Sequence, residues 1–117
     1  MMLRLIPTLK DYIWGGCKLK SLYGREGGEK ISESWEVSVH PDGPSKLENG
    51  GTLAQYLQGR PEAVSPKGGE LPVLIKYIDA ADNLSVQVHP CDEYARKYEN
   101  DNGKTEMWYI VQADEGA

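Results

Sequence analysis

Leu84-Ser85-Val86-Gln87-Val88-His89-Pro90 is the most informative stretch of this sequence. Apolar and polar side chains alternate along it, and this period of two predicts a β-strand with one packed face and one polar face. A second alternating stretch, Lys104-Thr105-Glu106-Met107-Trp108-Tyr109, follows and places Glu106 and Trp108 on one face. We therefore predict two neighbouring strands in a mainly β fold.

The polar faces of these two predicted strands carry metal-ligand chemistry. Residues two apart on a strand lie about 6.6 Å apart, so Gln87 and His89 can lean toward one ion. Glu106 on the second strand would supply a third ligand. A set of one nitrogen and two oxygen ligands suits zinc, although glutamine is an unusual ligand. The residues alone leave a second interpretation open, in which His89 is a hydrogen-bonded structural histidine.

Composition narrows the class of protein. The 117 residues are 39% hydrophobic and include three Trp and seven Tyr, which is enough for the core of one domain. The net charge is −5 and no Lys/Arg cluster occurs, which argues against a nucleic-acid or anionic-membrane partner. No stretch approaches the roughly 20 apolar residues of a membrane span. Cys17 and Cys91 form no disulfide framework, so we expect a cytoplasmic protein.

The remaining pattern predicts strands separated by Gly- and Pro-rich turns, with two short surface helices. The expected strands are Leu3–Ile6, Trp35–His40, Leu71–Asp79, Leu84–His89 and Lys104–Val111. The expected helices are Thr52–Gln58, which opens with a capping-box pattern, and Asp92–Tyr98. The chain is therefore expected to be mainly β.

Two lysines and one loop need an interpretation of their own. Leu71–Ile78 is apolar on both faces except at Lys76, which predicts an interior strand whose lysine needs an anion or a wet cavity. Lys104 is either a cation beside the metal or a solvated lysine after the Asn102-Gly103 turn. The Gly-rich stretch 24–30 lacks the Gly-Lys-Ser/Thr of a phosphate loop, so we expect a flexible loop.

Four segments together resemble one family, the type I mannose-6-phosphate isomerases, also called phosphomannose isomerases. They are Ser85–Pro90, Gly103–Tyr109, Glu33–Pro41 and Ile13–Gly16. The likeness runs from about Leu5 to the last residue, and the first two segments are highly specific. The resemblance implies a cupin-type (jelly-roll) β-sandwich and a zinc-dependent isomerase that interconverts mannose 6-phosphate and fructose 6-phosphate.

The resemblance also implies roles for individual residues. Gln87, His89 and Glu106 match the family's zinc ligands. Ser85 and Lys104 would help to hold the sugar phosphate substrate, and Trp14, Glu36 and Lys76 would line the pocket. The sequence departs from the family at Cys91, where an acidic residue is usual.

The family's fourth ligand, a histidine, and an important arginine lie beyond Ala117. We therefore expect residues 1–117 to be the N-terminal portion of a cupin-type isomerase domain that ends early. By itself the chain would be inactive, and it could self-associate through an exposed sheet edge.

Two other functions remain open from the sequence. A non-catalytic cupin would bind a sugar or sugar phosphate in the same pocket without turnover. An iron-dependent cupin oxygenase is less favoured, because such sites prefer two histidines and a carboxylate, and Gln87 stands in place of one histidine.

Overall fold

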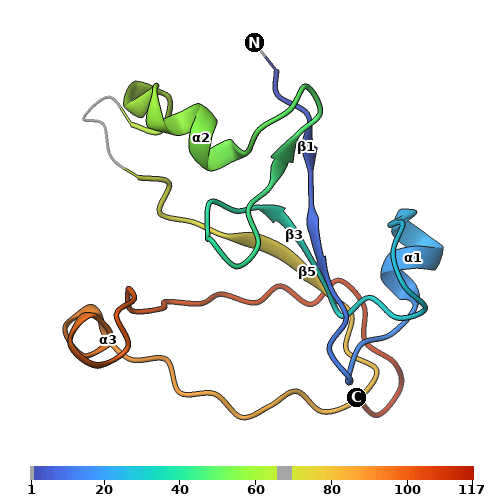
Figure 1. Ribbon diagram of the computed structural model, residues 1–117. Coiled ribbons are helices and arrows are strands. Elements are labelled where there is room, and N and C mark those ends of the chain that lie inside the picture. Colours follow the sequence, from blue (N-terminus) through green and yellow to red (C-terminus); the bar gives the residue numbers. More distant parts are fainter. Residues whose placement is uncertain (1, 66–69) are drawn as a thin grey trace. The chain divides into compact units, whose positions relative to one another are not determined.

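The computed structural model describes residues 2–65 and 70–117 and is shown in Figure 1. The chain divides into two compact units, Met1–Leu84 (unit 1) and Ser85–Ala117 (unit 2). Trp14, Glu36 and Lys76 belong to unit 1. Ser85, Gln87, His89, Lys104 and Glu106 all belong to unit 2, so the candidate metal ligands lie within one compact piece of chain.

Unit 1 contains two small antiparallel sheets. In one, β1 (Leu5–Ile6) pairs with β4 (Lys46–Leu47). In the other, β3 (Glu33–Val37) lies between β2 (Thr8–Lys10) and β5 (Ile75–Ile78). The register pairs Trp35 with Thr8 on one side and with Lys76 on the other, and a bulge follows Trp35. The strands of the described residues therefore form separate two- and three-stranded sheets, and they are not closed into a jelly-roll sandwich.

The helices are short. Unit 1 has α1 (Lys18–Tyr23), α2 (Leu53–Gln58) and the 3-10 turn η1 (Pro61–Ala63), and unit 2 has α3 (Asp92–Tyr98) (Figure 1). The predicted helices at α2 and α3 are confirmed. Helix α1 was not predicted from the sequence. It ends at Gly24, which has a left-handed conformation with φ 63°. No helix in the described ranges has the length and apolar character needed to cross a bilayer.

The capping box of α2 supplies a first testable prediction. Thr52 Oγ1 accepts the Gln55 N–H at 3.2 Å, and Gln55 Oε1 accepts the Thr52 N–H at 2.9 Å. Thr52→Ala removes one of these bonds and is expected to lower the free energy of unfolding by about 1 kcal/mol, measured by urea unfolding. Thr52→Ser keeps the hydroxyl and is the control. Equal stability of the Ala and Ser variants would contradict the capping role.

The core of unit 1 combines a few aliphatic side chains with buried serines. Leu19, Ile31, Leu47 and Leu53 are buried, as are Ser32, Ser34, Ser38 and Ser45. Ser45 illustrates how a buried hydroxyl is satisfied, because its Oγ accepts the Ser38 N–H at 2.9 Å and donates to Glu36 O at 3.2 Å. Small side chains let the backbone segments beside β3 approach closely.

The Gly15-Gly16 pair is one such close approach. A Cβ atom on Gly15 would lie 2.7 Å from Ser32 Cβ, and one on Gly16 would lie 2.8 Å from the Asp79 carboxyl carbon. Real Cβ atoms do not come this close to their neighbours. At Gly15 the neighbour includes the Ser32 backbone, so a side chain there would force the backbone apart, whereas at Gly16 it is the end of the Asp79 side chain, which can move. Trp14 is thereby anchored next to the ends of β3 and β5.

The predicted strands of unit 1 are confirmed in part. Strands occur within or next to the three predicted ranges, but they are shorter, and β3 ends at Val37 rather than at His40. The prediction that Leu71–Ile78 is buried on both sides is wrong. Strand β5 pairs with β3 on one edge, and Ile75 and Tyr77, which share one of its faces, are 54% and 39% exposed.

In unit 2 the predicted strands Leu84–His89 and Lys104–Val111 are not formed as strands. Two extended arms, residues 85–90 and 104–111, leave the ends of α3 (Figure 1). The Lys104 N–H donates to Pro90 O at 3.3 Å beside α3, and no ladder continues from there in the described part of the chain. A β-strand exists by pairing its backbone groups with a neighbour, and local alternation does not supply that neighbour.

Candidate metal centre

The two arms of unit 2 bring His89 and Glu106 into direct contact. His89 Nε2 lies 2.9 Å from Glu106 Oε2, although the two residues are 17 positions apart in the sequence. Lys104 Nζ lies 3.1 Å from the other carboxylate oxygen, Oε1. The His89 and Glu106 side chains are 28% and 22% exposed, so the pair is partly shielded but accessible to a ligand.

The surroundings of Glu106 favour its ionised form. Burial raises the pKa of the carboxyl, but hydrogen bonds from the His89, Lys104 and Trp108 side chains and the charge of Lys104 outweigh burial and lower the pKa to about 2. The carboxylate is therefore negative at neutral pH, as a metal ligand must be.

Gln87 is placed on the same arm by a bond to Ser85. The side-chain nitrogen Nε2 of Gln87 donates to Ser85 Oγ at 3.2 Å. Because the nitrogen makes this bond, the amide oxygen Oε1 is left as the group that can act as a ligand. Ser85 thus orients the amide, as strand-like alternation of residues 85 and 87 on one face would predict.

The donor set fits a zinc ion. Zinc binds histidine nitrogen and carboxylate oxygen at about 2.0 to 2.2 Å in tetrahedral geometry, which separates two ligand atoms by about 3.4 Å. The 2.9 Å between His89 Nε2 and Glu106 Oε2 is close to this separation. No group of three His, Cys, Asp or Glu residues is gathered within residues 2–65 and 70–117. The third candidate here is an amide, Gln87.

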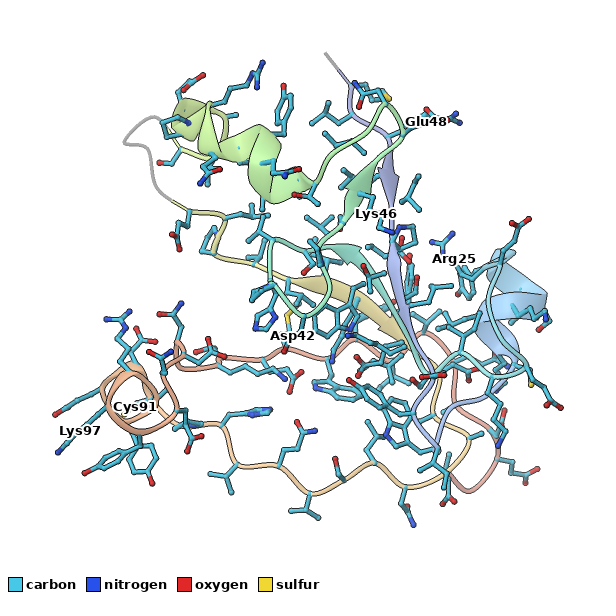
Figure 2. The ribbon with its side chains drawn as sticks, viewed as in Figure 1. Arg25, Asp42, Lys46, Glu48, Cys91 and Lys97 are labelled. Atoms are coloured by element: carbon cyan, nitrogen blue, oxygen red, sulfur yellow. The ribbon has the colours of Figure 1, made fainter. Side chains whose placement is uncertain are left out.

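Cys91, the position where the sequence departs from the family, precedes the first residue of α3 (Figure 2). Its thiol is free and exposed. Its side chain makes no capping bond to α3.

In unit 1, the ammonium group of Lys76 has an anionic partner. Its Nζ lies 2.9 Å from Glu33 Oε1, and the side chains of Lys76 and Glu33 are 18% and 7% exposed. The second oxygen of Glu33 accepts the indole N–H of Trp35 at 2.6 Å. Of the two alternatives that the sequence leaves open for Lys76, an anion or a wet cavity, the structure shows the anion.

Glu36 belongs to a different cluster. Arg25 Nη2 donates to both carboxylate oxygens of Glu36 at 2.8 Å, and Ser34 Oγ donates to Oε1 at 2.6 Å. Arg25, labelled in Figure 2, comes from the Gly-rich loop that the sequence analysis expected to be flexible. The loop is tied to β3 at this point, because the Arg25 guanidinium pairs with both carboxylate oxygens of Glu36.

The structure therefore divides the sequence-predicted residues into three groups. Unit 2 brings together His89, Glu106 and Lys104, with Gln87 and Ser85 bonded to each other nearby along the arm. Glu36 shares a face of β3 with Ser34, whereas Lys76 lies with Glu33 and Trp35 on the opposite face. Trp14 stacks on Tyr12, with ring centroids 5.6 Å apart.

Three of the residues that complete these clusters were missed from the sequence: Glu33, Arg25 and Trp108. For Trp108 a signal existed, since it falls on the Glu106 face of an alternating stretch. For Glu33 the signal was indirect, because Lys76 in an apolar strand needs an anion or a wet cavity. Arg25 gave no local signal, because its partner Glu36 is a long-range contact.

Comparison with known proteins gives one consistent family. The family described as phosphomannose isomerase type I, catalytic domain, matches residues 2–116. A mannose-6-phosphate isomerase of Streptococcus mutans is 42% identical over 90% of this chain and 35% of its own length.

Solved structures agree with the sequence matches. The crystal structure of the mannose 6-phosphate isomerase from Bacillus subtilis superposes with a TM-score of 0.89 at 36% identity, over 98% of this chain and 39% of that one. The Salmonella typhimurium enzyme bound to its substrate and to zinc gives a TM-score of 0.69 at 34% identity, over 85% and 28%. The chain thus spans less than two fifths of the length of these relatives.

Proposed function

The chain belongs to the type I phosphomannose isomerase family, and we propose that residues 1–117 are the N-terminal portion of a zinc-dependent mannose-6-phosphate isomerase. The observation that carries this proposal is the contact between His89 Nε2 and Glu106 Oε2 at 2.9 Å. It joins the two segments that most resemble the family, and it leaves the two candidate ligand atoms near the separation of about 3.4 Å that two zinc ligands have.

In this proposal His89, Glu106 and the amide oxygen of Gln87 hold the zinc, and a fourth ligand comes from beyond Ala117. Zinc, when bound, supplies a Lewis acid that polarises carbonyl and hydroxyl oxygens. Lys104 holds Glu106 through Oε1 and leaves Oε2 to face His89. Ser85 holds the amide nitrogen of Gln87, which leaves the amide oxygen as the donor atom for the metal.

The substrate proposed is a sugar phosphate, mannose 6-phosphate or fructose 6-phosphate. Isomerisation moves a proton between C1 and C2 through an enediolate, so the site must stabilise negative charge on oxygen. Lys104 is a cation whose side chain is still partly exposed, and it can serve a substrate oxygen as well as Glu106. Trp14, Glu36 and Lys76 are proposed, from the family resemblance, as further residues that contact the substrate. No residue in this chain is assigned as the base.

The proposal extends to the fold and the location. Residues 1–117 would be completed by further strands into a cupin-type β-sandwich, which would pair the arms of unit 2 and cover exposed apolar side chains such as Val86 and Met107. While they are unpaired, the backbone edges of these arms would favour self-association. A cytoplasmic location, expected from the sparse cysteines, is part of the same proposal.

A coupled assay on the full-length protein tests the function. We expect turnover of mannose 6-phosphate to fructose 6-phosphate, one zinc per chain by metal analysis, loss of turnover after chelation and recovery with zinc. The isolated 117-residue chain is expected to bind zinc weakly and to show little turnover. Stoichiometric sugar phosphate binding without turnover would favour the non-catalytic cupin, and full turnover by the isolated chain would contradict the proposed division of the site.

A further inference from the structure

A set of contacts at the base of α3 joins the two arms of unit 2 immediately next to the candidate ligands. We call this set the clasp; its members are Pro90, Asp92, Arg96, Asn102, Gly103 and Lys104. His89 directly precedes the first member, and Glu106 lies two residues after the last. The separation of the two arms at the ligands is therefore set by the clasp.

Asp92 is the centre of the clasp. Its Oδ1 accepts the backbone N–H of Gly103 at 2.9 Å, and its Oδ2 pairs with Arg96 Nη2 at 3.2 Å. Arg96 Nε in turn donates to Asn102 Oδ1 at 3.3 Å. One carboxylate thus ties the start of α3 to the turn that begins the second arm.

Gly103 makes this close approach possible. A Cβ atom on Gly103 would meet the backbone nitrogen of Asp92 and would lie 2.6 Å from the Cys91 carbonyl carbon and 2.8 Å from Pro90 O. Next to it, the Lys104 N–H donates to Pro90 O at 3.3 Å. The two arms therefore touch through their backbones, and this contact places residue 89 beside the start of the arm that carries residue 106.

We propose that Asp92 is a positioning residue for the metal centre, acting through the clasp to hold His89 and Glu106 at ligand distance before the metal arrives. This inference rests on the zinc-binding role proposed above and adds a residue to it. Asp92 is not itself offered as a ligand, because its two oxygens already hold Gly103 and Arg96. Holding the arms removes most of the chain entropy that closing the loop between the ligands would cost when the metal binds.

The strength of the clasp comes from geometry more than from charge. The Asp92 and Arg96 side chains are 60% and 65% exposed, and exposed ion pairs contribute little. The bond from the Gly103 N–H to Asp92 joins backbone and side chain 11 residues apart, and it needs an oxygen acceptor rather than a negative charge. An asparagine at position 92 can still supply that acceptor.

The test is the zinc dissociation constant of the metal-free full-length protein, measured by competition with a chromophoric chelator. We expect Asp92→Ala to weaken zinc binding about 10-fold or more, the effect typical of residues that orient ligands. Asp92→Asn should stay close to the unchanged protein. Glu93→Ala removes an equal charge from the same turn of α3 and should also leave the affinity unchanged. Because Asp92 is proposed to act only through the affinity for zinc, saturating zinc should return kcat and KM of Asp92→Ala to normal.

Each result has a defined meaning. Affinity of Asp92→Ala equal to that of Glu93→Ala would overturn the positioning role, as would Asp92→Asn being as weak as Asp92→Ala. If Asp92→Ala fails to fold by circular dichroism, Gly103→Ala decides: its Cβ would meet the backbone nitrogen of Asp92 and open the clasp, so it should weaken zinc binding, and unchanged affinity would overturn the role. A His89→Ala variant that keeps its zinc would instead overturn the proposed function itself.

Discussion

Replacing His89 by alanine in the full-length protein is expected to weaken zinc binding by more than about 100-fold, because a lost ligand costs more than a lost orienting residue. Glu106→Ala is expected to act in the same way. Both side chains would be direct ligands, and their atoms already lie 2.9 Å apart in this structure. Metal analysis after dialysis, combined with a zinc titration, measures the effect, and turnover should fall with the zinc content.

The matched control is His40→Ala. His40 is the only other histidine in the chain, and it also ends an alternating stretch, Val37-Ser38-Val39-His40. It lies in unit 1, where its Nδ1 accepts the Asp42 N–H at 3.1 Å. Zinc content should be unchanged in this variant. Full zinc occupancy in both His89→Ala and Glu106→Ala would show that these residues are not ligands.

Replacing Glu33 by alanine is expected to lower the free energy of unfolding by about 3 kcal/mol, because it leaves a largely buried ammonium without its partner. Glu33 Oε1 holds Lys76 Nζ at 2.9 Å, and Oε2 accepts the Trp35 indole N–H at 2.6 Å. The variant therefore loses the ion pair with Lys76 on the neighbouring strand and the hydrogen bond from Trp35. Equilibrium unfolding in urea measures the change.

Two further variants separate the causes of that loss. Glu48→Ala removes a carboxylate whose ion pair with Arg4 is exposed, with side chains 62% and 79% accessible, so the cost should stay below about 0.5 kcal/mol. Adding Lys76→Met to Glu33→Ala removes the unpaired charge and should restore part of the stability. If the double variant is no more stable than Glu33→Ala, the unpaired lysine is not the cause.

Local chemistry explains which elements the sequence could predict. The capping box of α2 joins residues three apart, so Thr52 and Gln55 contain all the information that it needs. Helix α3 has the acidic residues Asp92 and Glu93 in its first turn and the basic residues Arg96 and Lys97 in its last turn. This charge pattern complements the helix dipole and is also a local property of the sequence. The six-residue α1 has no acidic first turn and no capping side chain, and so gave no such signal.

The candidate site was predictable in its chemistry and less so in its contacts. The alternation of residues 84–89 and 104–109 placed amide, imidazole and carboxylate groups on polar faces, and the structure brings two of them together. The same reasoning gave strands where the described structure has extended arms. Alternation fixes which side chains share a face, whereas a ladder needs a second backbone at the right distance.

The sequence alone was enough for the candidate ligand types, the family resemblance, the two helices with local capping or charge signals, and the prediction that Lys76 needs an anion or a wet cavity. Only the tertiary structure decided that this anion is Glu33, that Arg25 pairs with Glu36, and that Asp92 ties the two arms together. The physical reason is range. Hydrogen bonds within one turn of helix are set by neighbours in the chain, but a contact such as His89 to Glu106 depends on how the intervening 16 residues fold, and here α3 and the clasp supply that fold.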